Sequence, residues 1–238
     1  MTRLRNLLRP LLSPAWQWWV LRNRMRALCA RCVGMLDHGL LFDAVSAVPE
    51  FAPLQHKVEF LEFMKLIAPV QPSRVCEIGS FKGGTGFLLS RVLPQNAILV
   101  LLDLEYGPPR RAALRSMARG NQQVFTLIGD SHRIEMRDEV SRKCGGDLLD
   151  VLFIDGDHSY EGVSRDLEIY APLVRSGGVI AFHDIVPLKS GGDSTTANPG
   201  NVPKFWEELK IRFPNRTHEF IRDREQSGCG IGVIHWQK

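Results

Sequence analysis

Short apolar runs alternate with amphipathic stretches from residue 74 onward. The apolar runs predict five strands, at Val75–Ile78, Ala97–Asp103, Val124–Ile128, Val151–Asp155 and Val179–His183. The stretches between them predict helices at Gly84–Leu93, Pro108–Arg119, Ile134–Cys144 and Val163–Val174. Strands that alternate with helices form a parallel sheet with right-handed crossovers. Residues 98–102 and 151–154 are continuously apolar, which is typical of strands covered on both faces.

Further elements flank this alternating region. Before it, apolar positions at helical spacing predict a helix at Pro53–Ala68. After it, the pattern predicts a helix at Lys204–Arg212 and two strands at His218–Arg222 and Gly230–Trp236. The segment Lys189–Asn201 is rich in Gly, Ser, Thr and Asn, and it is interpreted either as a lid over a site or as a surface insertion. The complete pattern predicts an α/β, Rossmann-like, doubly wound sheet.

The first 36 residues form a basic arm with seven arginines and no acidic residue before Asp37. Trp16, Trp18 and Trp19 lie between arginine clusters, as in helices at a membrane surface. Three interpretations stay open. They are peripheral membrane contact through residues 1–36, packing on the domain or on a partner subunit of a homo-oligomer, and mitochondrial targeting. We divide the chain into a basic, Trp-rich helical arm at 1–36 and one domain at 37–238.

The composition is that of a soluble globular protein, with 44% hydrophobic and 24% charged residues. The formal net charge of +4 comes from the arm, so we expect no nucleic-acid partner. The five cysteines are scattered, which favours reduced thiols and a cytoplasmic protein, with the inner face of the membrane as the alternative place. Cys29 and Cys32 form a C-x-x-C pair, but zinc needs two more ligands and none is near.

The segment Glu77–Gly86 joins the first strand to a helix through a glycine-rich turn. Such a turn lets a ligand approach bare backbone and directs the N–H groups of the helix toward it. Phe81 stands where the dinucleotide fingerprint needs a glycine, and Thr85 stands where a phosphate loop needs its lysine. An acidic residue and a glycine turn without a phosphate clamp suit S-adenosylmethionine, which has adenosine but no phosphate. A tight βα turn in another α/β protein is the alternative.

Acidic residues stand at or just after the carboxyl end of each strand of the alternating region. They are Glu77, Asp103, Asp130, Asp155 and Asp184. Ligands of open α/β sheets bind at this edge, so the five acids predict a shared binding edge. Asp103 lies 24 positions after Gly79, which suits a carboxylate that accepts both ribose hydroxyls. Asp130 and Ser131 can border the adenine; the alternative for Asp130 is a helix cap.

Strands four and five are expected to be neighbours, which brings Asp155 and Asp184 together. Two carboxylates with water suit a hard cation such as Mg²⁺, while His183 leaves Mn²⁺ or Fe²⁺ open. His158 lies three positions past Asp155 and is a candidate proton acceptor, because histidine titrates near neutral pH. The alternatives are a helix-capping role for His158 and a buried, hydrogen-bonded role for His183.

These residues resemble the class I S-adenosylmethionine-dependent methyltransferases. More narrowly, they look like the metal-dependent O-methyltransferase-like group that includes sugar and macrolide-sugar O-methyltransferases. The matching segments are EIGSFKGGTG, FIDGDHSYEGVSRDLEIYAPLVRSGGVIAFHDI and NVPKFWEELK. The resemblance spans about residues 55–236 and leaves the arm outside. It implies a seven-stranded, mostly parallel sheet whose last strand runs antiparallel to the rest.

The resemblance also implies roles for the matching positions. Those assigned to S-adenosylmethionine are Glu77, Gly79, Ser80, Gly83, Asp103, Asp130 and Ser131, and those assigned to the metal are Asp155, His183 and Asp184. His183 and Asp184 match an acid and an asparagine among the metal ligands of catechol O-methyltransferase, and His158 matches its catalytic lysine. These departures leave a ligand set and a base in place but open the identity of the metal.

The expected reaction is in-line attack of a substrate hydroxyl on the sulfonium methyl group of the cofactor. A divalent cation would lower the pKa of that hydroxyl, and His158 would take the proton. The expected acceptor is a hydroxyl of a small molecule or a glycan. Two alternatives remain, namely a methyltransferase that uses its histidine base without a metal, and a non-catalytic adaptor that keeps the fold.

Overall fold

The structure is a computed structural model that describes residues 14–189 and 198–238. Seven strands form one sheet in the order β3-β2-β1-β4-β5-β7-β6. Their bounds are β1 Arg74–Ile78, β2 Ile98–Asp103, β3 Gln123–Ile128, β4 Leu149–Ile154, β5 Val174–His183, β6 Thr217–Phe220 and β7 Ile231–His235. β7 pairs antiparallel with β5 and β6, and the remaining neighbours pair in parallel. The expected Rossmann-like fold with an antiparallel last strand is confirmed.

β1 lies in the middle of the sheet, with β2 on one side and β4 on the other, both parallel to it. The chain first adds β2 and β3 in one direction and then returns across β1 to add β4 and β5. Ligands of open α/β sheets bind at such a switch point, beyond the carboxyl ends of the strands. Glu77, Asp103 and Asp155, at the carboxyl ends of β1, β2 and β4, therefore share one edge of the sheet.

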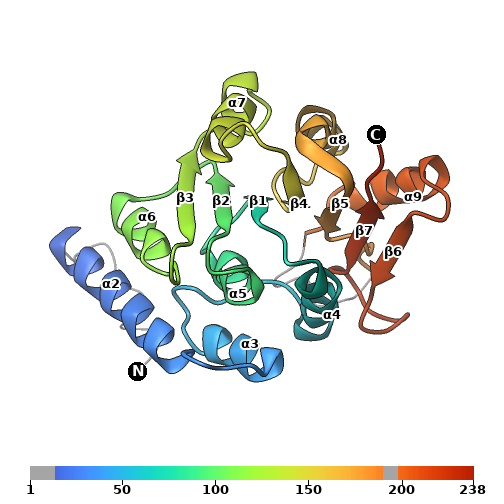
Figure 1. Cartoon of the computed structure of the whole chain (residues 1–238). Helices are drawn as coiled ribbons and strands as arrows, with labels where there is room; N and C mark the ends of the chain where they lie inside the picture. The colour runs from blue at the N-terminus through green and yellow to red at the C-terminus, as the bar shows by residue number, and fades with distance from the viewer. Residues whose placement is uncertain (1–13, 190–197) are drawn as a thin grey trace.

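Helices cover both faces of this sheet (Figure 1). Their bounds are α2 Pro14–Arg31, α3 His38–Ser46, α4 Lys57–Ile67, α5 Gly84–Val92, α6 Pro108–Arg115, α7 Ile134–Lys143, α8 Tyr160–Tyr170 and α9 Val202–Arg212, with 3-10 turns at Ala68–Val70 and Ala171–Leu173. Successive side chains of β1 point to opposite faces of the sheet, so this strand contributes to the hydrophobic core on each face. Val75 joins the core with α2 to α6, and Cys76 and Ile78 join the core with α7 to α9.

The helix expected from Pro53 begins at Lys57 instead. Residues 51–56 are not helical and run across the glycine turn. A side chain at Gly84 would lie 2.1 Å from the carbonyl oxygen of Phe51, so the two backbones are in direct contact. A backbone held this closely by a distant turn cannot adopt the helical path that its apolar spacing favours.

Helix starts follow local caps that the apolar pattern does not show. The sequence pattern predicts no helix at α3, where the Asp37 carboxylate accepts the N–H of Leu40. α8 begins earlier than predicted because the Ser159 hydroxyl accepts the N–H of Gly162. In both cases a short polar side chain satisfies a helix N–H group that would otherwise lack a partner.

β5 is longer than predicted, since it begins at Val174. The glycines at 177 and 178 interrupt the apolar pattern while the backbone stays in the strand, and the register with β4 shifts between Leu149 and Val151. β4 ends at Ile154, so Asp155 belongs to the turn that follows it. Most of the segment interpreted as a lid, residues 190–197, lies outside the described residues.

The basic arm contributes the helix α2, which packs against α6 (Figure 1). Met25, Leu28 and Cys32 are buried in the same core as α5. The side of α2 that carries Met25 and Leu28 therefore packs on the domain, which was one of the three interpretations of the arm. Within residues 14–189 and 198–238, no helix is long and apolar enough to cross a membrane.

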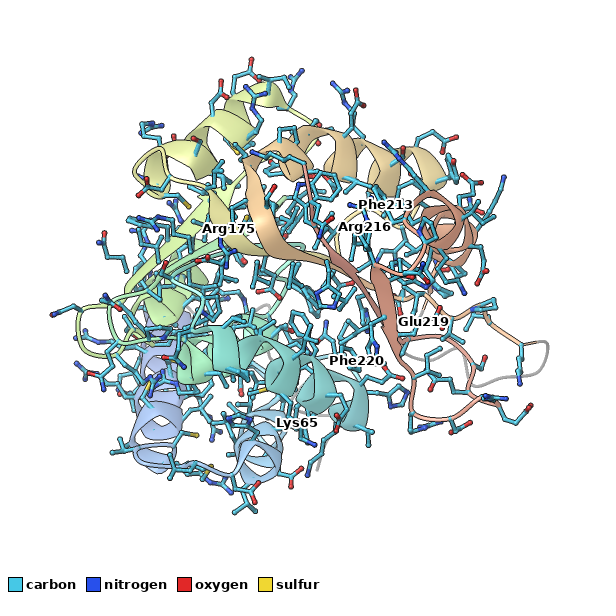
Figure 2. All side chains as sticks on the ribbon, turned by 45° about the vertical axis from the view of Figure 1, so that its right-hand side comes forward. Lys65, Arg175, Phe213, Arg216, Glu219 and Phe220 are labelled. Carbon is cyan, nitrogen blue, oxygen red and sulfur yellow. The ribbon has the colours of Figure 1, made fainter. Side chains whose placement is uncertain are left out.

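The last three elements are joined by one tryptophan of α9. The indole N–H of Trp206 donates to Glu219 of β6 over 2.6 Å, and Lys210 of α9 approaches the same carboxylate oxygen at 2.9 Å. Figure 2 shows Glu219 and Phe220 on β6, below Arg216 and Phe213. A side chain at Gly232 of β7 would lie 2.6 Å from the Trp206 ring. The close approach of α9 to the sheet therefore depends on this glycine.

We expect Gly232→Ala to lower the free energy of unfolding by about 1–3 kcal/mol, because a buried indole cannot move aside without strain. Urea denaturation followed by circular dichroism measures this value. Gly107→Ala is the matched control, since a side chain there meets nothing closer than 3.7 Å. Equal stability of the two variants would contradict the packing described for Trp206.

Candidate functional site

The turn between β1 and α5 can only be built with glycine at its first position. Gly79 has a φ of 83°, and a side chain there would lie 1.9 Å from the carbonyl oxygen of Asp155. Gly83 also has a φ of 83° and precedes the first residue of α5. Both values fall in the left-handed region that glycine adopts without strain. The turn thus exposes backbone at the N-terminus of α5, as the sequence predicts.

The Asp103 carboxylate lies directly against this turn. Its two oxygens accept the N–H of Phe81 over 2.6 Å and the N–H of Glu105 over 3.1 Å. Asp103 ends β2 and is half-buried. Each carboxylate oxygen has a further lone pair available. The spacing argument therefore placed Asp103 beside the glycine turn correctly, while its role toward a ribose stays a prediction.

Glu77 is buried at the end of β1, below the turn. Burial raises the pKa of this carboxyl well above its usual range, and the negative charges of Asp155 and Asp103 raise it further. Among the described residues, its Oε2 atom has no hydrogen-bond partner. Ser80 is also buried, and its hydroxyl lies 3.3 Å from the carbonyl oxygen of Leu102. Glu77 and Ser80 thus support the turn from beneath.

Asp130 and Ser131 follow β3 on the other side of the turn. The exposed Asp130 carboxylate accepts the N–H of His132 over 2.9 Å, within the turn before α7. The N-cap residue of α7 is Arg133, which makes no side-chain cap hydrogen bond, so the helix-cap alternative for Asp130 is wrong, and its contact with adenine stays a prediction. His132 also lies 3.6 Å from Asp166 of α8, a fully buried carboxylate that the sequence analysis missed. Burial raises the pKa of Asp166 to about 6.

The residues predicted to hold a metal converge beyond β4 and β5. The Nδ1 atom of His183 lies 3.1 Å from Asp155 Oδ1. His158 joins them, with Nε2 at 3.4 Å from Asp155 Oδ1 and Nδ1 at 3.6 Å from Asp184 Oδ2. His183 and Asp184 are buried, and Asp155 is largely buried. Two strand ends therefore bring two carboxylates and two imidazoles into one small volume.

These groups set one another's charge. Burial raises the pKa of Asp155, but the neighbouring His183 and His158 outweigh it and lower the value to about 2. A hydrogen bond with Asp155 raises the pKa of His158 to about 9. Burial lowers the pKa of His183, and the Asp155 carboxylate reverses this and raises it well above the ordinary value. Near neutral pH the cluster therefore holds protons on its histidines.

Cys229 belongs to the same cluster, although no motif in the sequence marks it. It lies in the turn before β7, and one ligand atom each from Cys229, His183 and Asp184 lie within 4.8 Å of one another. Asp184 and Cys229 have φ values of 63° and 59°, which are strained for residues other than glycine. The antiparallel pairing of β7 with β5 brings Cys229 here, and that pairing depends on tertiary structure.

Gln55 is the second residue that sequence reasoning missed. Its amide group donates to Asp155 Oδ2 over 2.7 Å and accepts the hydroxyl of Thr85 over 2.7 Å. It therefore bridges the acidic cluster and the first turn of α5. Gln55 stands before α4, in the segment that the apolar pattern predicts as helix. No motif marks it, because its position over the turn arises only when that segment is extended.

Two overlapping ligand sets fit a divalent cation. Asp155, His158 and Asp184 offer one, and His183, Asp184 and Cys229 offer the other, each with ligand atoms within 4.8 Å. The Asp184 Oδ1 and His183 Nε2 atoms are buried and have no hydrogen-bond partner in the described part of the chain. Buried polar atoms without a partner are costly, so a ligand that satisfies them would be stabilised here. The residues present therefore fit a metal ion.

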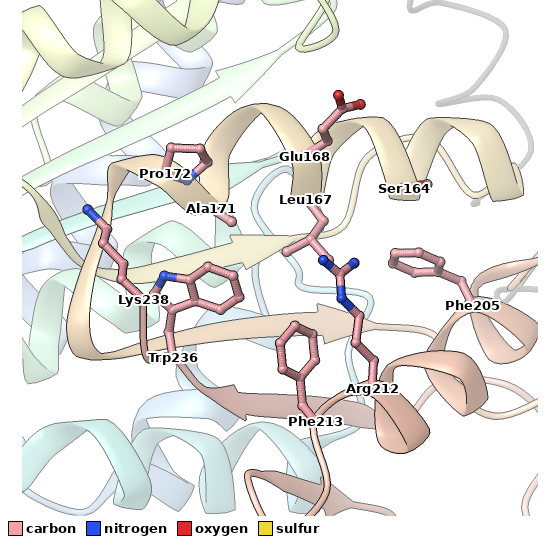
Figure 3. Close-up of a pocket in the computed structure, with 10 residues that line it drawn as sticks. All are labelled: Ser164, Leu167, Glu168, Ala171, Pro172, Phe205, Arg212, Phe213, Trp236 and Lys238. Atoms are coloured by element: carbon pink, nitrogen blue, oxygen red, sulfur yellow. The ribbon is translucent and has the colours of Figure 1, made fainter.

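The structure has one cavity at the glycine turn and another between α8 and α9. A small cavity of about 30 Å³ lies between the glycine turn, Gln55 and Asp155. Cavities that enclose small ligands measure roughly 300–1,000 Å³, so a nucleoside must also use the open surface beyond it. A larger cavity of about 620 Å³ lies between α8, α9 and the residues after β7, lined by Leu167, Phe213 and Trp236 among others (Figure 3).

A family model described as a methyltransferase domain matches residues 76–185. The match covers the glycine turn, Asp103 and the acidic cluster up to Asp184. The expected resemblance to class I S-adenosylmethionine-dependent methyltransferases is confirmed.

Two curated relatives are both uncharacterized proteins. One, from Acanthamoeba polyphaga mimivirus, is 32% identical over 45% of this chain and 49% of its own length. The other, from Sinorhizobium fredii, is 23% identical over 74% of this chain and 18% of its own length. This chain thus spans about half of the first relative and under a fifth of the second.

Solved structures show the same fold at low identity. An O-methyltransferase from Bacillus cereus in complex with SAH is 19% identical, with a TM-score of 0.58, over 88% of this chain and 97% of that one. The O-methyltransferase TomG from Streptomyces achromogenes, in complex with SAM, is 18% identical, with a TM-score of 0.58, over 90% and 98%. The MycE methyltransferase from the mycinamycin pathway, with Mg and SAH, is 17% identical, with a TM-score of 0.54, over 82% and 52%.

The charges of the cluster predict how stability changes with pH. His158 has a pKa of about 9 in the folded chain against 6.5 unfolded, so its contribution is full below pH 6.5 and is lost as the pH rises to about 9. In chelator, we expect the urea concentration at the unfolding midpoint to decrease as the pH is raised from 6.5 to 9. The decrease should be smaller in His158→Gln. His218→Gln is the control, since His218 is exposed on β6. An unchanged midpoint in the parent protein would contradict the pairing of His158 with Asp155.

Proposed function

We propose that this protein transfers a methyl group from S-adenosylmethionine to a hydroxyl of a small molecule or a glycan. The observation that carries this proposal is the position of the acidic cluster. Asp155 follows β4, and the Asp155 N–H donates to the carbonyl oxygen of Ile78, the residue before the glycine turn, over 2.9 Å. A methyl donor on that turn and an acceptor at the cluster would therefore be adjacent. The SAM or SAH named for two of the similar structures supports the choice of donor.

The cofactor would lie along the edge formed by β1, β2 and β3. The bare backbone of the turn at Gly79 and Gly83 would face its methionine and ribose portions. Asp103 would accept hydrogen bonds from the ribose hydroxyls with the lone pairs that its two backbone donors leave free. Asp130 and Ser131 would border the adenine. A cation such as the sulfonium would be favoured here, because its positive charge would stabilise the Asp103 carboxylate and the ionised form of Glu77.

Asp155, Asp184 and His183 would hold a divalent cation, with Cys229 and His158 next to them. Mg²⁺ suits the carboxylates, whereas the imidazole and the thiol favour Mn²⁺ or Fe²⁺. The bound ion would supply a lowered pKa and a fixed orientation to the acceptor hydroxyl. The presence of Mg in the MycE structure supports this choice.

His158 is the candidate proton acceptor. Its Nδ1 atom lies 2.6 Å from the carbonyl oxygen of Asn198, so that nitrogen carries a proton and Nε2 is left to exchange one. Paired with Asp155, His158 stays protonated near neutral pH and cannot act as a base. When Asp155 and Asp184 neutralise another cation, their hold on the imidazolium weakens. Deprotonation of His158 and occupation of the two carboxylates are therefore coupled.

One observation favours a metal-independent methyltransferase as the second candidate. His183 lies 3.1 Å from Asp155 and can neutralise that carboxylate without any metal. In that case His183 would weaken the hold of Asp155 on His158, His158 would accept the proton, and the reaction would rely on positioning of donor and acceptor. A non-catalytic adaptor remains the third candidate and differs from both in that it need not bind S-adenosylhomocysteine.

We expect Asp103→Ala to weaken the binding of S-adenosylhomocysteine by roughly 10- to 100-fold, because hydrogen bonds to a charged group contribute about 1.5–3 kcal/mol each. Isothermal titration calorimetry measures this value. Glu105→Ala, which removes an exposed carboxylate two residues away, should bind like the parent protein. If the parent protein itself gives no binding heat, the adaptor is the better description.

Metal dependence is tested by chelation of the full chain. We expect activity toward a mixture of hydroxylated metabolites to be lost in chelator and restored by Mg²⁺ or Mn²⁺, with a change on the order of 100-fold or more. Asp155→Asn should show the same loss while its binding of S-adenosylhomocysteine stays near that of the parent. Full activity in chelator would exclude the metal and leave the histidine-only mechanism.

A further inference from the structure

The outer side of α2 carries exposed aromatic residues. Met25 and Leu28 are buried against the domain on one side of this helix. Helical periodicity places Trp16 and Trp19 on the opposite side. Their side chains are 45% and 59% exposed, and their rings stack with centroids 5.0 Å apart. α2 is therefore apolar on two sides, of which only one is covered by the described residues.

Arginines flank this aromatic side. Arg24 and Arg26 lie on its two edges, and Arg22 and Arg31 extend the edges along the helix. All four are exposed, and none forms an ion pair within the described residues. The whole segment up to Asp37 lacks an acidic residue. The aromatic side is thus bordered by positive charges that form no ion pair within the described residues.

Further exposed apolar side chains lie past the C-terminal end of α2, at the other end of the helix from the tryptophans. Val33 and Leu36, in the turn before α3, are 80% and 90% exposed, and Leu40 in α3 is 58% exposed. Figure 1 shows α2 at the edge of the molecule, beside α6 and next to α3. Exposed apolar side chains at both ends of one helix are a feature of surfaces that bind something.

Charge decides which partner fits this surface. Two copies of the chain that met on this face would bring the same arginines together, and like charges across an interface are unfavourable. An anionic lipid surface has the opposite charge and accepts the tryptophans at the depth of its headgroups. Arginine side chains at the flanks can then reach lipid phosphates while their stems stay apolar. A helix that lies in the plane of the membrane has this distribution of residues.

We propose that α2 and the turn at residues 32–37 bind the surface of an anionic lipid bilayer, with Trp16 and Trp19 in the headgroup layer and Arg22, Arg24 and Arg26 on lipid phosphates. This site is separate from the methyltransferase site and does not depend on the proposed reaction. It places the domain at the membrane surface without a membrane span.

The test is sedimentation of the full chain with lipid vesicles. We expect binding to vesicles that contain phosphatidylglycerol, weak binding to phosphatidylcholine alone, and release at high salt. Replacing Arg22, Arg24 and Arg26 by Gln should weaken binding on the order of 100-fold, since each arginine near such a surface contributes about a fivefold change. Arg142, Arg212 and Arg224 replaced by Gln form the matched control and should bind like the parent.

A second variant separates the tryptophans from the charge. Trp16→Ser with Trp19→Ser should reduce vesicle binding while the urea midpoint and binding of S-adenosylhomocysteine stay unchanged. Equal binding to neutral and anionic vesicles, or equal binding of the arginine variant and its control, would overturn the proposal. It would also be overturned if light scattering showed a dimer that the tryptophan variant dissociates while vesicle binding persists, because this face would then be a subunit contact.

Discussion

The backbones of β1 and β4 touch where both strands end, and the rest of the site depends on this contact. The N–H of Asp155 donates to the carbonyl oxygen of Ile78. The backbone of Asp155 lies so close to Gly79 that a side chain at position 79 would collide with it. The contact exists because the chain returns across β1 between β3 and β4. It fixes the distance between the glycine turn and the acidic cluster. Any reaction between groups bound at these two places is limited by this geometry.

Crowded negative charge is the second constraint at this edge. Glu77, Asp155 and Asp184 are all largely or fully buried and face one another. The structure accommodates them in two ways, since burial favours the protonated form of Glu77 and two histidines neutralise Asp155. Each compensation is reversible when a ligand brings its own positive charge. A sulfonium cofactor and a divalent cation are both such ligands, which is why one edge can serve for both.

The two sides of α2 show how one helix can hold a domain and still present a surface. Burial of Met25 and Leu28 fixes the helix against α6. This leaves the tryptophans and arginines on the outer side in a fixed arrangement. Binding of a partner to this side would then require little further ordering of the chain.

Much of the fold and part of the site could be predicted from the sequence. The apolar runs predicted the strands, because a strand buried on both faces must be apolar throughout. Their alternation with helices predicted that neighbouring strands run parallel. The acids at the strand ends followed: Asp103 lies against the glycine turn, and Asp155 lies beside His183 because β4 and β5 are neighbours. The tryptophans and arginines of the arm were visible as well, although their distribution between the two sides of α2 was not.

Tertiary structure decided the remainder. Gln55 reaches Asp155 because residues 51–56 are pressed against Gly84, and Cys229 reaches His183 because β7 pairs with β5. The protonation of Glu77 and His158 likewise depends on neighbours from other strands. Local sequence determines which backbone conformation a segment favours. It does not determine which distant segment lies beside it, and burial and charge in this site arise from those distant neighbours.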